Sequence, residues 1–227
     1  MRADWLALLP MLLAGASAQA RTPFQARCED SITRSVSVLQ SSQHGYSIDN
    51  TQSFKTLTRM KAPAQRNSYV LGLTRTESRV SVALNGPILQ DRGSGYECVA
   101  PQIRVTLFYA PIVVFVGREF KPGGCSYKHI LAHEMRHLKT YLDHLPKVET
   151  LVRGALARRF QGKPLYAPIG QAQRLLEREI DTGWMPYMKR EMAAVEALQA
   201  AIDTPQEYAR LSKVCQGEVQ SLIRAAR

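Results

Sequence analysis

Beyond its first 20 residues, the 227-residue sequence contains no apolar run long enough to cross a membrane. A membrane-spanning helix needs roughly 20 consecutive apolar residues. The sequence also lacks internal repeats, low-complexity tracts and any linker that would divide it. Together with an ordinary content of hydrophobic and charged residues, these absences exclude disordered, collagen-like and coiled-coil proteins and predict one soluble globular domain.

Acidic residues are scarce: 19 Asp and Glu stand against 30 Lys and Arg, which gives a net charge of +11. This balance excludes an acidic solvating tail. No run concentrates the positive charge, and no basic stretch is interleaved with aromatic residues, so nucleic acid is not an expected partner. The charge does support one non-catalytic alternative, a basic envelope-binding protein that recognises anionic cell-surface polymers.

Residues 1–20 have the pattern of a secretory signal peptide. Arg2 is followed by an apolar run from Trp5 to Ala14, and small residues end in Ala18-Gln19-Ala20. The run contains Pro10 and is shorter than a membrane span, which disfavours an uncleaved anchor. We therefore expect cleavage after Ala20, a single mature domain over 21–227, and a periplasmic or secreted location.

The four cysteines are never close enough in sequence for the C-x2–4-C spacing of a zinc site. In an oxidising compartment an even number of cysteines predicts two disulfides, and four cysteines allow three pairings that sequence alone cannot distinguish. The pairing that we expect is Cys28 with Cys98, tying the first strand to the sheet, and Cys125 with Cys215, tying the start of a central helix to the last helix.

The pattern of apolar residues changes near Lys121-Pro122-Gly123-Gly124. From Cys28 to about Val116 the apolar positions alternate, as in Ile103 to Tyr109, which predicts half-buried antiparallel strands. After the change they recur with the helical period. The sequence thus predicts an α+β fold, with an N-terminal antiparallel sheet followed by a C-terminal block of helices.

Four helices are expected in the second half. Ser126 is a candidate N-cap, Pro146 is expected to end or kink the first helix, and Thr204-Pro205-Gln206-Glu207 is a capping box. The expected helices cover Ser126–Leu145, Lys147–Phe160, Ile169–Ile202 with a bend at Gly183 and Pro186, and a last helix beginning at Thr204.

His133-Glu134-Met135-Arg136-His137 is an HExxH motif inside the first of these helices. Histidines four residues apart lie one turn above each other, so His133 and His137 can bind one zinc ion while Glu134 points towards a metal-bound water. The leucines of this helix fall on the opposite face. The alternative is an amphipathic helix whose histidines lie on its solvated face.

A catalytic zinc ion usually has three protein ligands. On a straight helix His144 lies about 10 Å along the axis from His137, and His129 lies about 12 Å from it, so neither reaches the same ion. Glu179 lies within the apolar stripe of the later helix, where a carboxylate needs a partner. Glu179 is therefore the predicted third ligand, with His144 on a broken helix, or Glu179 paired with an arginine, left as alternatives.

Several segments follow one another in a fixed order: Gly45-Tyr46-Ser47-Ile48, Ser53-Phe54-Lys55-Thr56-Leu57, Gly72-Leu73-Thr74, Cys98, the strand Ile103 to Leu107, and HExxH. This order resembles a bacterial family described as predicted secreted zinc-dependent proteases, whose function is not established. The resemblance covers about Val38 to Phe160. It implies zinc as the cofactor, His133 and His137 as metal ligands, and Glu134 as the catalytic residue.

Together these features predict a monomeric, exported zinc metallohydrolase, and more narrowly a metallopeptidase that cleaves peptide or cell-wall amide bonds. Glu134 is the expected general base. A further side chain should stabilise the oxyanion, and Tyr141, Tyr187 and His129 are the candidates.

Overall fold

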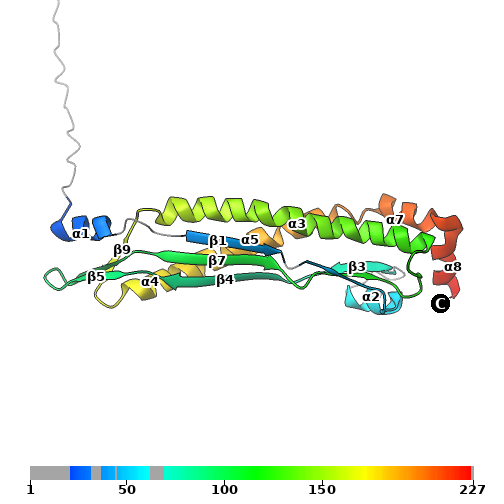
Figure 1. The fold of residues 1–227 in the computed structure, drawn as a ribbon, viewed down its shortest axis with the longest axis horizontal. Helices are drawn as coiled ribbons and strands as arrows, with labels where there is room; N and C mark the ends of the chain where they lie inside the picture. The colour runs from blue at the N-terminus through cyan, green and yellow to red at the C-terminus, as the bar shows by residue number, and fades with distance from the viewer. Residues whose placement is uncertain (1–20, 32–36, 44, 62–68, 226–227) are drawn as a thin grey trace, which may run out of the picture.

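The structure is a computed structural model that describes residues 21–31, 37–43, 45–61 and 69–225, with the backbone alone at residues 31 and 37–43. The molecule is elongated, and one long helix, α3 (Cys125–Phe160), runs beside the strands along most of its length (Figure 1). The predicted signal peptide lies outside the described residues.

Within the described residues the strands form three small sheets, in the orders β1-β7-β4, β2-β8-β3 and β5-β6-β9. The pairings of β1 with β7 and of β2 with β8 are parallel and the other four are antiparallel, so the predicted antiparallel sheet is in fact three sheets, two of which are mixed. The strands are β1 (Ser37–Gln43), β2 (Ser47–Asp49), β3 (Gly72–Arg75), β4 (Ser78–Asn85), β5 (Ile88–Asp91), β6 (Tyr96–Val99), β7 (Gln102–Tyr109), β8 (Val113–Val116) and β9 (Leu165–Pro168).

The main core lies between β7 and the helices. Ile103, Val105, Leu107 and Tyr109 alternate along β7 and are all buried, as the period of two predicts. They pack against one face of α3 and against apolar residues from α4 to α6. The α+β fold class predicted from the sequence is confirmed.

Helix α3 passes through Pro146 without ending there, so the two helices predicted on either side of this proline are one. A proline inside a helix removes a hydrogen bond and costs about 3 kcal/mol. Leu145 and Val148 are buried on each side of it, and their packing in the core offsets that cost. The N-cap is Gly124 rather than Ser126, whose hydroxyl instead donates a hydrogen bond to Glu218 at 2.5 Å.

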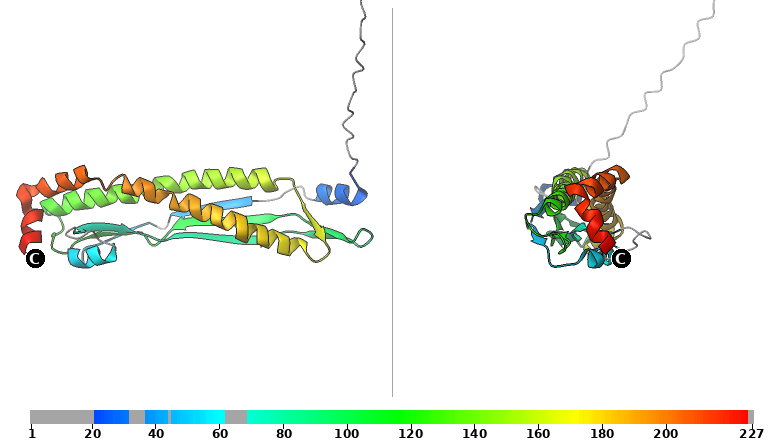
Figure 2. Two further views of the ribbon diagram at one scale, coloured as in Figure 1. Left: turned by 180° about the vertical axis from the view of Figure 1, so that it is seen from behind. Right: turned by 90° about the vertical axis from the view of Figure 1, so that its right-hand side faces the viewer.

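The later helices return along α3 towards its N-terminal end (Figure 2). Where a bend was predicted near Gly183 and Pro186, the helix contains a π-helical turn, a rare irregularity that occurs mostly as single turns within α-helices and is one cause of helix kinks. This return path brings the end of α6 and the start of α7 beside the HExxH motif. The elements are α4 (Ala172–Glu179), η1 (Ile180–Trp184), α5 (Met185–Ala193), α6 (Val195–Ala200), α7 (Pro205–Lys213), η2 (Cys215–Gly217) and α8 (Glu218–Ala225).

Two disulfides join Cys28 to Cys98 and Cys125 to Cys215, which confirms the predicted pairing. Cys28 lies on a helix, α1 (Pro23–Ser31), and not on a strand as expected; the other short helix of this half is α2 (Phe54–Met60). Structural disulfides are typical of exported proteins. In the described part of the chain, no helix is long and apolar enough to cross a membrane.

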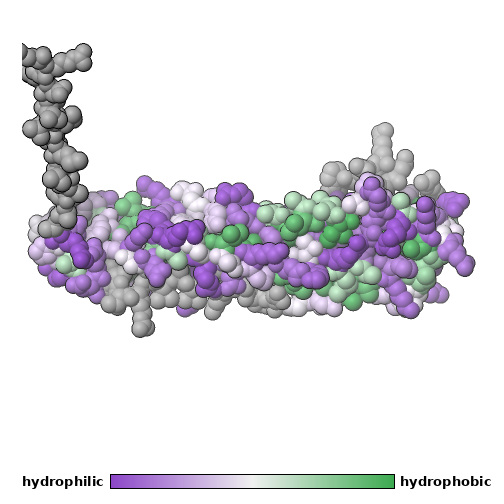
Figure 3. Space-filling view, turned by 90° about the horizontal axis from the view of Figure 1, so that it is seen from above, coloured by the Kyte–Doolittle hydropathy of each residue, from purple (hydrophilic) through white to green (hydrophobic). Residues whose placement is uncertain are grey.

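The face that carries α3 is hydrophilic along most of its length, with small apolar areas in between (Figure 3). The apolar areas are largest between the centre and the right-hand end of this view.

Glu97 on β6 is 2% exposed and forms the N-terminal cap of α4 from a distant part of the chain. Its carboxylate accepts hydrogen bonds from the backbone N–H of Ala172 at 2.8 Å and from the Gln90 side chain at 3.0 Å. Backbone hydrogen bonds from Gly170 and Ala172 hold the pKa of Glu97 below its usual 4.5, despite burial.

Replacing Glu97 by alanine should therefore lower the free energy of unfolding by about 2 kcal/mol at neutral pH, because buried N–H groups lose a charged acceptor. Since the folded-state pKa is lowered, this contribution is complete above pH 4.5 and is lost as the pH falls through the lowered pKa. Urea unfolding at pH 7 and pH 3 measures both effects. Glu77→Ala, which removes an exposed carboxylate paired with Arg79, is the control and should change little; equal losses in the two variants would contradict this role of Glu97.

Candidate metal centre

His133, Glu134 and His137 lie on α3 and are 4%, 4% and 8% exposed. Leu138 and Leu145 of the same helix pack in the core, and the opposite face presents the HExxH side chains to β3 and to the segment from α6 to α7. The amphipathic pattern correctly predicted the two faces of the helix. The histidines are not on a solvated surface, however, because other segments cover them.

Three ligand atoms converge above this face. His133 Nε2 and His137 Nε2 lie 3.2 Å apart, and Asp203 Oδ1 lies 3.1 Å from each of them. Asp203 belongs to the turn between α6 and α7. Two imidazole nitrogens and a carboxylate oxygen are a typical donor set for a divalent zinc ion.

The other ring nitrogen of each histidine faces an oxygen acceptor. Gln199 Oε1 lies 2.6 Å from His137 Nδ1, and the amide of Gln199 also donates to the backbone oxygen of His137 at 3.1 Å. Glu207 Oε1 lies 3.2 Å from His133 Nδ1. Acceptors at Nδ1 favour the tautomer that leaves Nε2 free to bind a metal, as the outer partners of metal-bound histidines commonly do.

Glu207 is held by two arginines as well as by His133. Arg210 donates to it at 2.9 and 2.7 Å, and Arg136 also contacts its carboxylate. The hydrogen bond from Arg210 is the main cause that lowers the pKa of Glu207 to about 2. Arg136 lies 2.8 Å from His133 Nδ1 too, but the ionised Glu207 is the acceptor that suits a protonated Nδ1.

The Glu134 carboxylate faces β3 at the edge of its sheet. The Thr74 hydroxyl lies 3.0 Å from Glu134 Oε2 and 3.0 Å from the backbone oxygen of the same residue. Burial raises the pKa of Glu134, against the opposing effect of the nearby histidines. A carboxylate with a raised pKa beside a candidate metal centre has the properties of a general base.

Gly72 is the reason that Glu134 can approach β3 so closely. A Cβ atom at this position would lie 2.7 Å from Glu134 Cγ and 2.8 Å from both Glu134 Oε1 and Ile130 Cγ2. These distances are too short for real contacts, so any larger residue must displace the carboxylate or the strand.

For the zinc-dependent hydrolase proposed below, we expect Gly72→Ala to reduce turnover about 100-fold, because a displacement of about 1 Å is enough to misalign a catalytic group. Zinc content should be unchanged, since Glu134 is not among the converging ligand atoms. The matched control is Gly183→Ala, where an added Cβ would meet no atom within 4 Å. Turnover at the wild-type level in Gly72→Ala would contradict the role assigned to this close contact.

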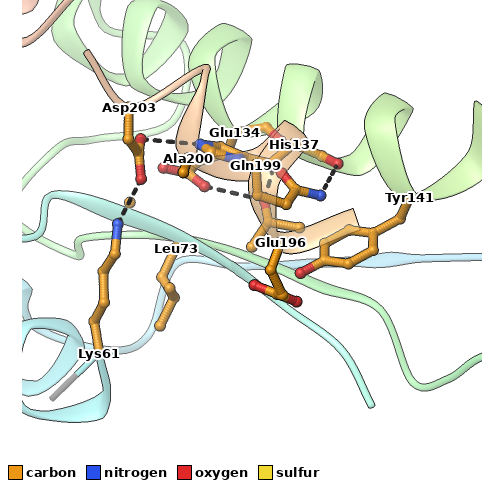
Figure 4. A pocket seen from close by; sticks show the side chains of 11 residues that line it. Lys61, Leu73, Glu134, His137, Tyr141, Glu196, Gln199, Ala200 and Asp203 are labelled. Carbon is orange, nitrogen blue, oxygen red and sulfur yellow. Dashed lines mark hydrogen bonds and ion pairs between the residues drawn. The ribbon is translucent and has the colours of Figure 1, made fainter. Parts of the chain in front are cut away.

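The site opens into a pocket of about 260 Å³. Lys61 and Asp203 lie at one side of it and Tyr141 and Glu196 at the other, with Glu134 and His137 between them (Figure 4). Lys61 Nζ is 2.7 Å from Asp203 Oδ2, the oxygen that does not face the histidines. The pocket thus combines a candidate metal centre, a buried carboxylate and one nearby cation.

The electrostatics keep the third candidate ligand ionised. Burial raises the pKa of Asp203, but hydrogen bonds with His133, His137 and Lys61 outweigh it and hold that pKa well below its usual value. Burial alone would lower the pKa of His137, but the hydrogen bond to Asp203 is among the interactions that outweigh burial, and the pKa of His137 is raised. In the absence of a metal, the carboxylate of Asp203 thus favours the protonated form of His137.

The structure does not bring Glu179 to the histidine pair, and the prediction that it is the third ligand is wrong. Both carboxylate oxygens of Glu179 accept hydrogen bonds from Arg159, at 2.8 and 2.7 Å. Arg159 lies on α3, about 33 Å beyond His137 at 1.5 Å per residue. The arginine alternative considered for Glu179 is the one observed, and Asp203 takes the place beside the histidines.

His144 and His129 also lie away from the pair. His144 is buried, and its Nδ1 lies 3.0 Å from the hydroxyl of Tyr109, which itself donates to the backbone oxygen of Met192. His129 lies close to Cys125 and Cys215, whose sulfur atoms form a disulfide and therefore are not free thiolates. Because α3 is continuous, neither histidine reaches the ion that His133 and His137 could share.

Of the candidates for stabilising an oxyanion, Tyr141 lies at the pocket and Tyr187 does not. Tyr141 lines the pocket, and burial raises its pKa to about 12, so its hydroxyl stays protonated and can donate. Tyr187 instead packs on α5 against Trp184 and Arg190. Tyr208, which the sequence did not single out, has its ring centroid 6.3 Å from that of His133, and burial together with the nearby charge of Asp203 raises its pKa.

Sequence reasoning missed the segment that completes the site. Gln199, Asp203 and Glu207 follow one another at intervals of four residues and all face α3. The capping box was recognised, and Thr204 does accept from the Glu207 N–H at 3.1 Å. The Glu207 side chain is directed to His133. The sequence signal for this segment was the spacing of Gln199, Asp203 and Glu207, three polar residues that follow one another every four positions.

Comparisons of the chain with protein-family models, with curated proteins and with solved structures found no match. The resemblance to predicted secreted zinc-dependent proteases therefore stays a prediction, and the interpretation of the site rests on its own residues.

Proposed function

We propose that this protein is an exported zinc-dependent hydrolase, and specifically a metallopeptidase, with His133, His137 and Asp203 as the zinc ligands. The observation that carries the proposal is the convergence of three ligand atoms whose histidines are both fixed at Nδ1 by acceptors. Hydrogen bonds to the two histidines do not require their Nε2 atoms to face each other. A metal ion bound by both histidines does require it.

The distances fit zinc. Ligands at about 2.0 to 2.1 Å from a tetrahedral zinc ion lie about 3.3 Å from one another. The three separations among the histidine nitrogens and the Asp203 oxygen are 3.2, 3.1 and 3.1 Å. Nitrogen and carboxylate ligands in this number, with the pocket beside them, support a catalytic rather than a structural zinc site.

The residues around the site support hydrolysis. A bound zinc ion would polarise a substrate carbonyl and lower the pKa of a water molecule. Glu134 would act as the general base and proton donor of the hydrolysis, a role supported by its buried carboxylate at the wall of the pocket. Tyr141 can donate a hydrogen bond to the oxyanion from the far side of the pocket.

The first experiment measures metal content and hydrolysis together. Protein exported and purified without chelator should contain about one zinc ion per chain, and a chelator should remove both metal and activity. Fluorogenic peptide libraries and cell-wall stem peptides cover the two amide substrates predicted from the sequence. A protein that binds no zinc would contradict the metal centre, and a zinc-loaded protein that cleaves no amide would favour the envelope-binding alternative.

A further inference from the structure

Both the third metal ligand and the two outer partners come from one short stretch of chain. We define residues 199–217 as the ligand arm: it begins with Gln199, carries Asp203 and Glu207, and ends at η2. The two histidines, by contrast, are fixed on the continuous helix α3. Metal binding therefore depends on how firmly the arm is held against this helix.

The arm has little apolar packing of its own. Within α7 the single buried side chain is Leu211, and Tyr208 is 47% exposed. The contacts of Glu207 with His133 and Arg136 are polar, and the one with Arg136 is exposed. Segments with few buried apolar contacts open at low energetic cost, so the arm needs an additional restraint.

The Cys125–Cys215 disulfide supplies a covalent restraint at the point where the arm ends. Cys125 is the first residue of α3, about 12 Å before His133 along the helix axis, and Cys215 is the second residue after the end of α7. The bond fixes the end of the arm to the same helix that carries both histidines. On the other side, Gln199 fixes the start of the arm to His137.

We propose that the Cys125–Cys215 disulfide is a positioning element for the metal centre, which holds Asp203 and Glu207 over the histidine pair and makes zinc affinity depend on oxidation. This inference rests on the proposed function. The disulfide forms by exchange with an oxidised dithiol protein: the new S–S bond replaces the one in that protein, which takes up the two electrons and two protons. High affinity for zinc is then acquired after export, in the compartment where structural disulfides persist.

The second disulfide provides a control within the same molecule. Cys28 and Cys98 join α1 to β6 at the opposite end of the elongated fold from α7 and α8 (Figure 1). Both cysteines are buried, and neither belongs to the ligand arm or to the pocket. Its loss should affect stability without moving Asp203 relative to the histidines.

The test compares the zinc dissociation constants of two folded double variants. In Cys125→Ser/Cys215→Ser we expect zinc binding about 10- to 100-fold weaker than in wild type, which is the usual effect of removing a residue that orients a metal ligand. In Cys28→Ser/Cys98→Ser the constant should stay at the wild-type value. Serine variants avoid free thiols, which together with His129 would form a competing set of ligands.

The outcomes separate the two proposals. Absence of zinc binding in the wild-type protein would remove the metal centre itself, whereas equal affinity of wild type and Cys125→Ser/Cys215→Ser would overturn the positioning role alone.

If that variant does not fold, hydrogen–deuterium exchange on the metal-free wild-type protein gives the answer. Cys125 is exposed and Cys28 and Cys98 are buried, so TCEP should reduce Cys125–Cys215 first. Exchange should then rise in residues 199–217, and unchanged exchange there would overturn the proposal.

Discussion

Replacing Asp203 by alanine is expected to weaken zinc binding by more than about 100-fold, because even the loss of a residue behind a metal ligand costs 10- to 100-fold. The substitution also leaves Lys61 without the carboxylate that it contacts at 2.7 Å, so a positive charge would remain beside the site. Competition with a chromophoric chelator measures the dissociation constant directly.

Glu179→Ala is the matched comparison, since it also removes one carboxylate from the helical half. It should leave zinc affinity at the wild-type value, because Glu179 binds Arg159 at the far end of α3. Circular dichroism on both variants separates metal loss from unfolding. A strong effect of Glu179 together with normal binding in Asp203→Ala would show that the ligand assignment is reversed.

Replacing Glu134 by glutamine is expected to lower kcat by about 100- to 10,000-fold, the usual contribution of a general base. The amide has nearly the same shape as the carboxylate, so it fits beside Gly72 and can still bond with Thr74. Zinc content should stay near one ion per chain, because the ligand atoms are unchanged. Steady-state kinetics on a peptide substrate, with metal analysis of the same sample, measures both.

The control for this variant is Glu196→Gln, which alters a carboxylate in the same pocket that contacts neither the histidines nor Asp203 in the described structure. Its kcat should stay within an order of magnitude of wild type, whatever its effect on KM. Retention of full kcat in Glu134→Gln would show that another group accepts the proton.

The layout of the fold could be predicted from periodicity because each half buries one face. Alternating apolar residues in β7 and the apolar stripe of α3 both enter the same core, so local pattern and tertiary packing agree. The parallel pairing of β1 with β7 could not be predicted, since side-chain alternation is the same in parallel and antiparallel strands. Pro146 was misjudged because packing on both sides of it outweighs the lost hydrogen bond.

Only the residues of the candidate site that are close together in the sequence could be predicted. His133, Glu134 and His137 lie within five residues of one another, and a helix places them without any knowledge of the fold. Asp203 is 66 residues beyond His137 and lies in a turn, and its four-residue spacing from Gln199 and Glu207 does not indicate which helix this segment meets. Glu179 fitted the apolar stripe of its helix, but a stripe indicates which face is buried and not which partner a carboxylate meets there.

The most direct test of the account is anomalous diffraction at the zinc edge from crystals of the zinc-loaded protein. We predict a single strong peak about 2.0 to 2.2 Å from His133 Nε2, His137 Nε2 and one oxygen of Asp203, with Gln199 and Glu207 at the Nδ1 atoms as they are now. A peak that lacks Asp203 among its ligands, or no peak between the two histidines, would contradict the central claim.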